Sequence, residues 1–403
     1  MSKSGRVTWG PVAVALACGL LAGVQLGSIG PIELDLRRDL GISPEQAGWA
    51  ASAITAVPAL LGLAGGLWIR RAGPRLAIVL GLLGLAAAGG ACAVAPNGPV
   101  LLAARVVQGA GYLLAAAGAP IAIARMTEGA TRRVALALWT TVIPSGLAVA
   151  AAAGGWLSSV AGWRVWLALA AAALIPLVAL AATLPAESGA GAGARRPIRA
   201  ADLGRPLLLA TGFGLAALIG VAVVISFPTY LASERGAGSA TAGAATALVS
   251  LSSIAGSLVA GWLVRRGAGL RTLAPVGLLI PAAAIPAFSA AVPASANVAA
   301  GMLIMLANGV VVAAAFASVP DVSAGDIELT NGAIAQLGSL GNLLGPPLFA
   351  VAVALGGWAS LWLVALPLMA ASAGLLLAAA VSRPAGPASP GPRSEPSRRR
   401  ERR

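Results

Sequence analysis

The chain has 403 residues, of which 58% are hydrophobic and only 10% are charged, whereas soluble globular domains carry about 25% charge. This composition excludes a soluble globular protein and is typical of a polytopic membrane protein. The net charge of +14 comes from arginines in short clusters between apolar runs, not along one basic face, so we expect no nucleic-acid partner. The chain has no histidine, and Cys18 and Cys92 lie inside apolar runs. We therefore expect no metal, no cofactor and no disulfide.

Turn and charge signals divide the apolar runs into twelve predicted transmembrane helices, which makes the fold class all-α. Six lie within 1–184, at 11–32, 46–69, 76–95, 99–124, 134–157 and 164–183. Residues 185–205 are small, polar and basic, as in a linker between two bundles. Six more helices lie within 206–383, at 207–232, 241–264, 273–292, 296–318, 330–355 and 359–381. Residues 384–403, rich in proline, serine and arginine, predict a disordered basic tail.

The basic residues predict the orientation in the membrane. If the N-terminus is cytoplasmic, 22 of the 27 lysines and arginines fall in cytoplasmic segments and four fall outside. Cytoplasmic loops of membrane proteins carry this excess of positive charge. We therefore expect a multi-pass protein of the plasma membrane with both termini in the cytoplasm.

Arg105, in the fourth predicted helix, is the one remaining basic residue. A guanidinium in hydrocarbon costs between about 3 and 10 kcal/mol, so such residues face protein or a water-filled cavity and mark transport paths. Arg105 and Gln108 lie on one stripe of the helix, and Gln25 lies at a similar depth, about 10 Å from the outer face by helix rise. We expect Arg105 to contact substrate beside Gln25. Two alternatives stay open: Arg105 reaches the interface with its long side chain, or it only ties helices together.

The chain also repeats itself at a spacing of 195 residues. The segment 64–71 resembles 259–266, and the Gly-Trp pair at 162–163 recurs at 357–358. A shared offset of nearly half the length predicts two pseudo-symmetric bundles of six helices, as in transporters built from parallel repeats.

Polar residues inside the apolar runs indicate which helices face a cavity. The third, sixth, ninth and twelfth runs carry almost none, as suits helices that face lipid. Four polar residues lie roughly 13 to 19 Å from a membrane face by helix rise, near the midplane where such transporters bind substrate. Each single residue could instead form only a helix-to-helix hydrogen bond worth about 0.6 kcal/mol. These four residues are Gln108, Ser253, Asn308 and Asn342. Together with Gln25 and Arg105 they form the candidate substrate cavity.

Two motifs resemble signatures of the major facilitator superfamily, and the resemblance covers the chain to about residue 383. Residues 66–75, GLWIRRAGPR, are similar to the G-x-x-x-D-R-x-G-R-R signature, and residues 105–109, RVVQG, match R-x-x-Q-G. Arg70 stands where the first signature has aspartate. The fifth helix lacks the Gly-Pro pair of the antiporter motif, but the eleventh has Gly345-Pro346 in the equivalent place.

The resemblance implies a transporter, not an enzyme, that works by alternating access. The signature loop, its repeat and the small residues of the fifth and eleventh helices are the candidate gating residues, although close packing without motion would explain the small residues equally well. These candidates are Gly66, Arg70, Arg71, Gly73, Arg265, Arg266, Gly146, Gly341, Gly345 and Pro346.

Proton coupling requires a titratable group near the cavity. All thirteen carboxylates lie in loops or at helix ends, and the candidates nearest the predicted cavity are Glu33 and Asp35, at the outer end of the first helix. The simpler interpretation of Glu33 is a solvated end residue.

The sequence therefore predicts a monomeric secondary transporter of a small molecule in the lipid bilayer. We expect an exporter of small amphipathic or drug-like compounds. The alternative is an importer or exchanger of a small organic anion that Arg105 binds, because a buried cation is a natural partner for a carboxylate. A non-transporting sensor would need an added signalling or binding domain, and we expect none from this sequence.

Overall fold

The computed structural model describes residues 9–128, 131, 135–136, 138–185, 204–323 and 327–381. Every regular element in these ranges is helical, and twelve helices are long and apolar enough to cross a membrane. The all-α class and the twelve predicted spans are thereby confirmed. Apart from Pro185, Gly204 and Arg205, the predicted linker 185–205 lies outside the described residues, as does the tail 384–403.

The first half of the chain supplies six of the twelve spans, and several of them consist of more than one helix. In chain order the elements are α1 (Trp9–Gly27), η1 (Gly30–Ile32), α2 (Glu33–Leu40), α3 (Pro44–Ser52), η2 (Ala53–Thr55), α4 (Ala56–Ala72), α5 (Pro74–Ala93), α6 (Gly98–Met126), α8 (Val142–Ala161), α9 (Trp163–Ala172) and α10 (Leu174–Ala182).

The second half supplies the other six spans. Its elements are α11 (Gly204–Arg235), α12 (Ser239–Arg265), α13 (Leu270–Leu273), η4 (Ala274–Leu278), α14 (Leu279–Ala287), α15 (Ala294–Ala317), α16 (Val319–Val322), α17 (Ile327–Gly356), η5 (Trp358–Ser360) and α18 (Leu361–Val381).

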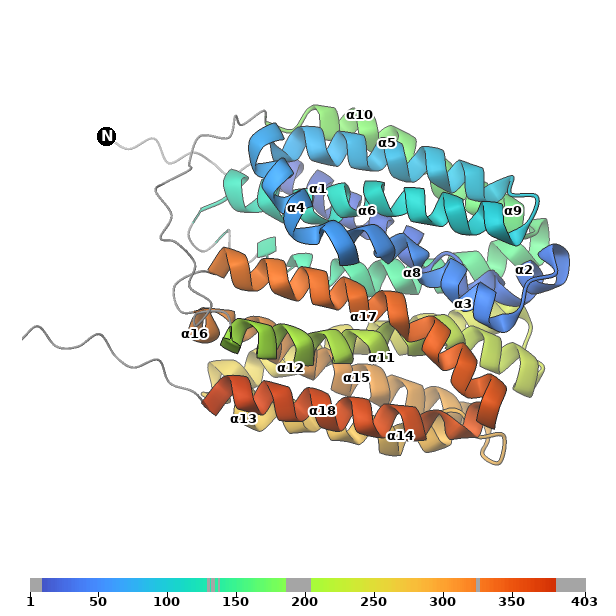
Figure 1. The fold of residues 1–403 in the computed structure, drawn as a ribbon. Helices are drawn as coiled ribbons and strands as arrows, with labels where there is room; N and C mark the ends of the chain where they lie inside the picture. Colours follow the sequence, from blue (N-terminus) through green and yellow to red (C-terminus); the bar gives the residue numbers. More distant parts are fainter. Residues whose placement is uncertain are drawn as a thin grey trace, which may run out of the picture.

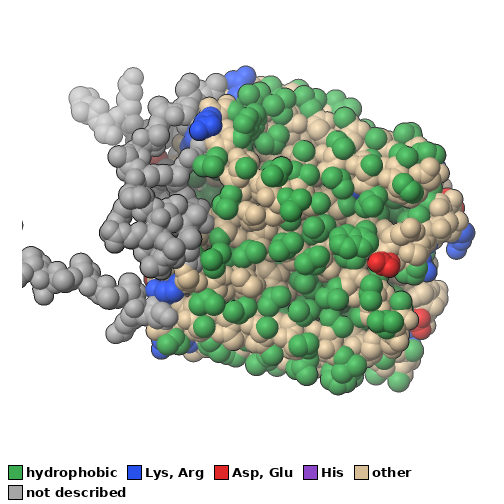
Figure 2. Space-filling model, in the orientation of Figure 1, with side chains coloured by type: hydrophobic (Ala, Val, Ile, Leu, Met, Phe, Trp, Pro, Cys, Tyr) green, Lys and Arg blue, Asp and Glu red, His purple; other side chains and the backbone are tan. Residues whose placement is uncertain are grey.

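The two halves of the chain occupy different sides of the molecule. In Figure 1 the helices of the first half lie above those of the second, with α5 and α10 along one edge and α13, α14 and α18 along the other. Charged side chains gather at the two ends, and the surface between them is a broad belt of hydrophobic and uncharged atoms (Figure 2). Such a belt is what a protein presents to lipid.

The two charged ends are built from the turns between helices. We call one the linker end: it contains the turns at Gly73 and Gly267 and the start of α11. The other is the cavity end, with the turns at Gly41, Gly162, Gly236 and Gly357. The predicted topology would place the linker end in the cytoplasm.

The first two spans are broken rather than continuous, which the apolar patterns did not predict. The first is interrupted between Gly27 and Glu33, where Pro31 lacks the N–H that a continuing helix needs. The second changes to a 3₁₀ turn at Ala53–Thr55. There the hydroxyls of Ser52 and Thr55 donate to the carbonyls of Gly48 and Ser52 at 3.1 and 2.7 Å, and such local bonds compete with helix geometry.

Two other predicted helices have different bounds in the structure. In the fifth, the described residues 135–136 and 138–139 are helical, a turn follows at 140–141, and α8 begins only at Val142. The ninth ends at Ala287 instead of 292 and divides into α13, η4 and α14. Proline explains the second difference, because η4 has a proline in its first turn and α14 contains Pro286.

The internal repeat has a geometric counterpart. Gly162 and Gly357, 195 residues apart, both have positive φ, of 86° and 71°, where each turn enters the last span of its half. Only glycine adopts this conformation readily. In the same way, Gly146 of α8 packs against the backbone of α1, while Gly341 of α17 packs against that of α11. Equivalent spans therefore cross through equivalent glycines in the two halves.

Candidate functional site

Arg105, on α6, is fully buried, with 1% of its surface exposed. Its Nε donates to the Ala50 carbonyl at 2.8 Å, and one terminal nitrogen donates to the Ala51 carbonyl at 2.7 Å and toward that of Leu26 at 3.4 Å. The other terminal nitrogen donates to the Gln25 carbonyl at 2.9 Å and to Gln108 Oε1 at 2.7 Å. A guanidinium has five N–H groups, so all five are occupied by protein acceptors.

The partners of Arg105 explain how a cation is tolerated here without a carboxylate. The Gln25 and Leu26 carbonyls lie in the last turn of α1, and the Ala50 and Ala51 carbonyls lie in the last turn of α3. The last four carbonyls of a helix lack partners within it, and a helix C-terminus carries about −0.5 elementary charge. The two helix ends together therefore offset about one positive charge. Arg105 closes the breaks in both the first and the second span.

Gln25 and Gln108 extend this network across the first half of the chain. Gln108 Nε2 donates to Gln25 Oε1 at 2.8 Å, and Gln25 Nε2 donates to the Ala170 carbonyl of α9 at 2.7 Å. The structure thus brings together Gln25, Arg105 and Gln108, three of the six predicted cavity residues. Their polar atoms bond to one another and to backbone, so this cluster binds α1, α3, α6 and α9 together.

The other three predicted cavity residues belong to the second half and lie on separate helices. Ser253 is buried and donates to the Ser250 carbonyl of its own helix, α12, at 2.8 Å. Asn308 of α15 is also buried and donates to the Ala216 carbonyl of α11 at 2.7 Å. Asn342 of α17 is half-buried, and its Oδ1 has no hydrogen-bond partner. Their role as substrate contacts stays a prediction.

Asn342 has a counterpart on the same helix. Gln336 of α17 also has a buried side-chain oxygen without a partner, and it faces Gly62 of α4, across the interface between the halves. Buried acceptors without a donor are costly and rare in folded proteins. These two amides are therefore acceptors in the second half whose hydrogen-bonding capacity is unused among the described residues.

The predicted gating residues other than Pro346 lie in three places. Gly73, with φ of 90°, forms the turn between α4 and α5 at the linker end. Beside it Arg71 is exposed, and the Arg70 side chain lies outside the described atoms. Gly66, earlier on α4, has open space beside it. Arg265 and Arg266 occupy the equivalent turn after α12, and Arg266 stacks over Trp262 at 4.0 Å. The third group lies where neighbouring helices of the same half cross, and it consists of Gly146, Gly341 and Gly345.

The halves themselves meet through close backbone contacts. At Gly155 of α8 a Cβ would clash with the Ser239 carbonyl of α12. At Gly48 of α3 it would lie 3.1 Å from the Pro346 carbonyl of α17. Nearer the linker end, the Ser250 hydroxyl of α12 donates to the Pro144 carbonyl of α8 at 3.0 Å. The predicted gating residue Pro346 thus lies at the contact between the halves.

A cavity of about 230 Å³ lies between the halves at the cavity end. The first half contributes Glu33, Arg37, Pro44 and Gly48, and the second contributes parts of α11 and α17 together with Trp358. The lining therefore combines two carboxylates and one guanidinium with hydroxyls and an apolar wall. The residues that α11 and α17 contribute include Ile225, Ser226, Thr229, Ser233, Glu234, Phe349, Ala350, Val353 and Ala354.

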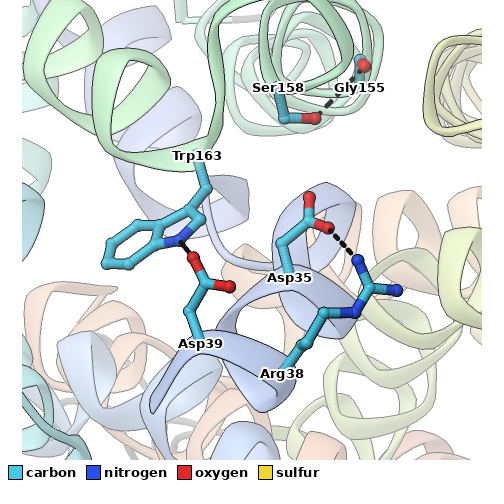
Figure 3. Close-up of polar contacts among 6 residues, drawn as sticks. All are labelled: Asp35, Arg38, Asp39, Gly155, Ser158 and Trp163. Carbon is cyan, nitrogen blue, oxygen red and sulfur yellow. Dashed lines mark hydrogen bonds and ion pairs between the residues drawn. The ribbon is translucent and has the colours of Figure 1, made fainter.

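The two predicted coupling residues have different surroundings. Asp35 pairs with Arg38 at 3.9 Å on the outside of α2, and nearby Asp39 accepts a hydrogen bond of 2.8 Å from Trp163 Nε1 (Figure 3). Glu33 instead is half-buried in the wall of the cavity, and its Oε2 accepts from the Thr229 hydroxyl of α11 at 2.8 Å. This hydrogen bond joins the two halves.

Sequence reasoning placed Glu33 at the end of the first helix but did not find its partners. Thr229 and Trp358 lie 196 and 325 residues away along the chain, and no motif connects them to Glu33. The helix breaks beside Arg105 were missed as well, although Pro31 marks one of them. Among the described residues no group of three His, Cys, Asp or Glu side chains could hold a metal ion.

Known proteins resemble this chain in sequence and in fold. The family model of the Major Facilitator Superfamily matches residues 15–213 and 208–402. The methylenomycin A resistance protein of Bacillus subtilis (strain 168) is 29% identical over 184 residues, which are 44% of this chain and 39% of that protein. The puromycin resistance protein pur8 of Streptomyces alboniger is 35% identical over 161 residues, which are 39% of this chain and 31% of that protein. The chain thus matches less than half the length of either relative.

Two solved structures share the fold over nearly the whole chain. Both are of a bacterial homologue of the human lysosomal transporter Spinster in an inward-facing conformation. The unoccupied form has a TM-score of 0.70 at 17% identity and covers 94% of this chain and 96% of that one. The occupied form has a TM-score of 0.68 at 16% identity and covers 92% and 94%. At such low identity the likeness shows the fold alone.

Proposed function

Because the chain belongs to the Major Facilitator Superfamily, and so is a membrane transporter of small molecules and not an enzyme, we propose that it exports small amphipathic compounds by alternating access. The observation that carries the proposal is the cavity between the halves, which joins an apolar wall to a few charged and hydroxyl side chains. A site of this kind fits a ligand with an apolar body and one polar group. Both halves line it, so their relative motion would open and close it.

The resistance relatives support the outward direction. Two proteins with sequence similarity to this chain are named for resistance to methylenomycin A and to puromycin. Removal of a toxic compound from the cell is the simplest way in which a membrane transporter gives resistance. Movement against the substrate gradient would require coupling, for which Glu33 in the cavity wall is our candidate and Asp35, already paired with Arg38, is a weaker one.

The geometry does not favour the organic-anion alternative. That alternative needs Arg105 to present its guanidinium fork to a substrate carboxylate. All five N–H groups of Arg105 already donate to protein oxygens, four of them backbone carbonyls. An anion would have to displace the carbonyls that the guanidinium holds.

An export assay tests the proposed function. A bacterial host that lacks its own efflux pumps is loaded with puromycin, a bulky amine, or with benzoate, a small organic anion, and the loss of each compound from the cells is followed. We expect the chain to speed the loss of puromycin and to leave benzoate unaffected.

The same host carrying a Gly155→Leu variant provides the control for leak and for expression. This variant places a side chain against the Ser239 carbonyl, so we expect it to reach the membrane but not to transport. Faster loss of benzoate alone, or accelerated uptake of either compound, would contradict the proposal and favour the anion alternative.

A further inference from the structure

The strongest feature without an assigned ligand is the half-buried carboxylate of Glu33, in the cavity between the halves. The other two acidic side chains of α2 have partners: Asp35 is paired with Arg38, and Asp39 accepts a hydrogen bond from Trp163 (Figure 3). No described basic side chain lies within 4.0 Å of Glu33, whose hydrogen bond comes from the neutral Thr229 hydroxyl. Arg37, one turn along α2, acts on Glu33 electrostatically from the same cavity lining but forms no ion pair with it. A carboxylate that is partly removed from water without a cation in direct contact is costly, and inside a membrane protein it marks a functional site.

The rest of the cavity indicates what would pair with Glu33. A second carboxylate, Glu234, is exposed at the mouth, while Arg37 contributes one positive charge, so the ionised lining is net negative by one. The hydroxyls of Ser226, Thr229 and Ser233 add oxygen acceptors to the same lining. A cationic group would gain from these oxygens, whereas an anion would meet two carboxylates.

Another part of the lining is apolar and aromatic. Phe349 and Val353 of α17 line it with Trp358. Trp358 is held by stacking on Phe288, with ring centroids 5.9 Å apart and planes at 9°, and by contact with Tyr230 at 5.4 Å. A fixed aromatic wall suits an apolar ligand body, and aromatic faces also attract organic cations.

We propose that this cavity binds small organic cations, with Glu33 as the countercharge and the wall of Phe349, Val353 and Trp358 holding the apolar part. The proposal deepens the proposed function, on which it rests, by naming the class of compound and the residue that selects for it. Because Glu33 and Arg37 come from the first half and the wall comes from the second, a bound cation contacts both halves. Because the predicted topology places the linker end in the cytoplasm, we expect an exported cation to leave the protein at the cavity end.

Calorimetric titration of the purified protein with benzyltrimethylammonium tests this site directly. The probe joins one permanent positive charge to one aromatic ring and is small enough for a cavity of about 230 Å³. Glu33→Gln keeps the size of the side chain and an acceptor for Thr229 but removes the charge. We expect it to raise the Kd of the probe about tenfold.

Two further variants separate site chemistry from general effects. Arg37→Gln removes the positive charge that lines the same cavity, so we expect it to lower the Kd by about threefold. Glu45→Gln removes an equal charge from the exposed surface of α3 at the cavity end, but Glu45 does not line the cavity. We expect it to leave the Kd unchanged. If Glu33→Gln does not fold, the decrease in Kd that we expect for Arg37→Gln still tests the proposal.

Three results would overturn the inference: no binding to the wild-type protein, an equal loss in the variants of Glu33 and Glu45, or weaker binding in Arg37→Gln. The proposed function fails separately. If puromycin is exported but Glu33→Gln leaves the Kd of the probe unchanged, the exporter stands and this site falls. If the probe binds as expected but no compound is exported, the site stands and the exporter falls.

Discussion

At the scale of single residues, Arg105 stabilises the fold through the directions of its hydrogen bonds. Its guanidinium joins the ends of α1 and α3, and each of its N–H groups has a partner. Lysine has three donors on one point charge and cannot reproduce this fork. We expect Arg105→Lys to lower stability by about 1–3 kcal/mol, because at least two buried acceptors lose their donors. Arg105→Gln should lose more. The midpoint of thermal unfolding in detergent measures both effects.

Arg164 provides a matched control for that substitution. This side chain belongs to α9 and is exposed, and one of its nitrogens donates to the Ala93 and Ala95 carbonyls at the end of α5, at 3.1 and 3.0 Å. A lysine can satisfy both acceptors, so Arg164→Lys should cost much less. Equal losses at the two positions would contradict the account of Arg105. Weaker binding of transported compound by folded Arg105→Gln would instead support the substrate contact expected from the sequence.

At the scale of elements, the crossing of α8 and α12 shows how the halves close at the cavity end. Gly155 approaches the backbone of α12 so closely that any side chain would collide with the Ser239 carbonyl. Such overpacking costs about 1–3 kcal/mol, which shifts a two-state equilibrium by about 5- to 150-fold. We expect Gly155→Leu to hold the cavity end open, so that transport is lost while benzyltrimethylammonium still binds.

Gly90→Leu is the control for that prediction. Gly90 lies on α5, and a Cβ added there would have no other atom within 4 Å, so the same substitution meets no neighbouring helix. Transport rates in reconstituted vesicles, measured beside Kd, separate the two positions. Normal transport by Gly155→Leu, or an equal loss in both variants, would show that this crossing does not need to close.

At the scale of the whole molecule, the sequence predicted the features that depend on local pattern. Hydrophobic runs of sufficient length determine the twelve spans, and the repeated Gly-Trp pairs correspond to turns of equal geometry. The cavity could not be predicted in this way, because Glu33, Thr229 and Trp358 meet only after the two halves have packed together. The role of Arg105 depended on helix breaks that a hydrophobicity pattern does not resolve.

The central claim is that the two halves move so that the cavity end and the linker end open in turn. Spin labels measure this most directly, after Cys18 and Cys92, both buried, are replaced by alanine. One pair is placed at the cavity end, at Arg38 of α2 and Leu355 of α17, and another at the linker end, at Arg71 of α4 and Arg265 of α12. All four positions are exposed, and each pair joins the two halves.

Electron–electron distance measurements are then made on both pairs, with and without a transported compound. Alternating access predicts that the compound shifts the two distance distributions in opposite directions, one pair separating as the other approaches. Distances that stay unchanged at both ends, or that widen together, would contradict the account.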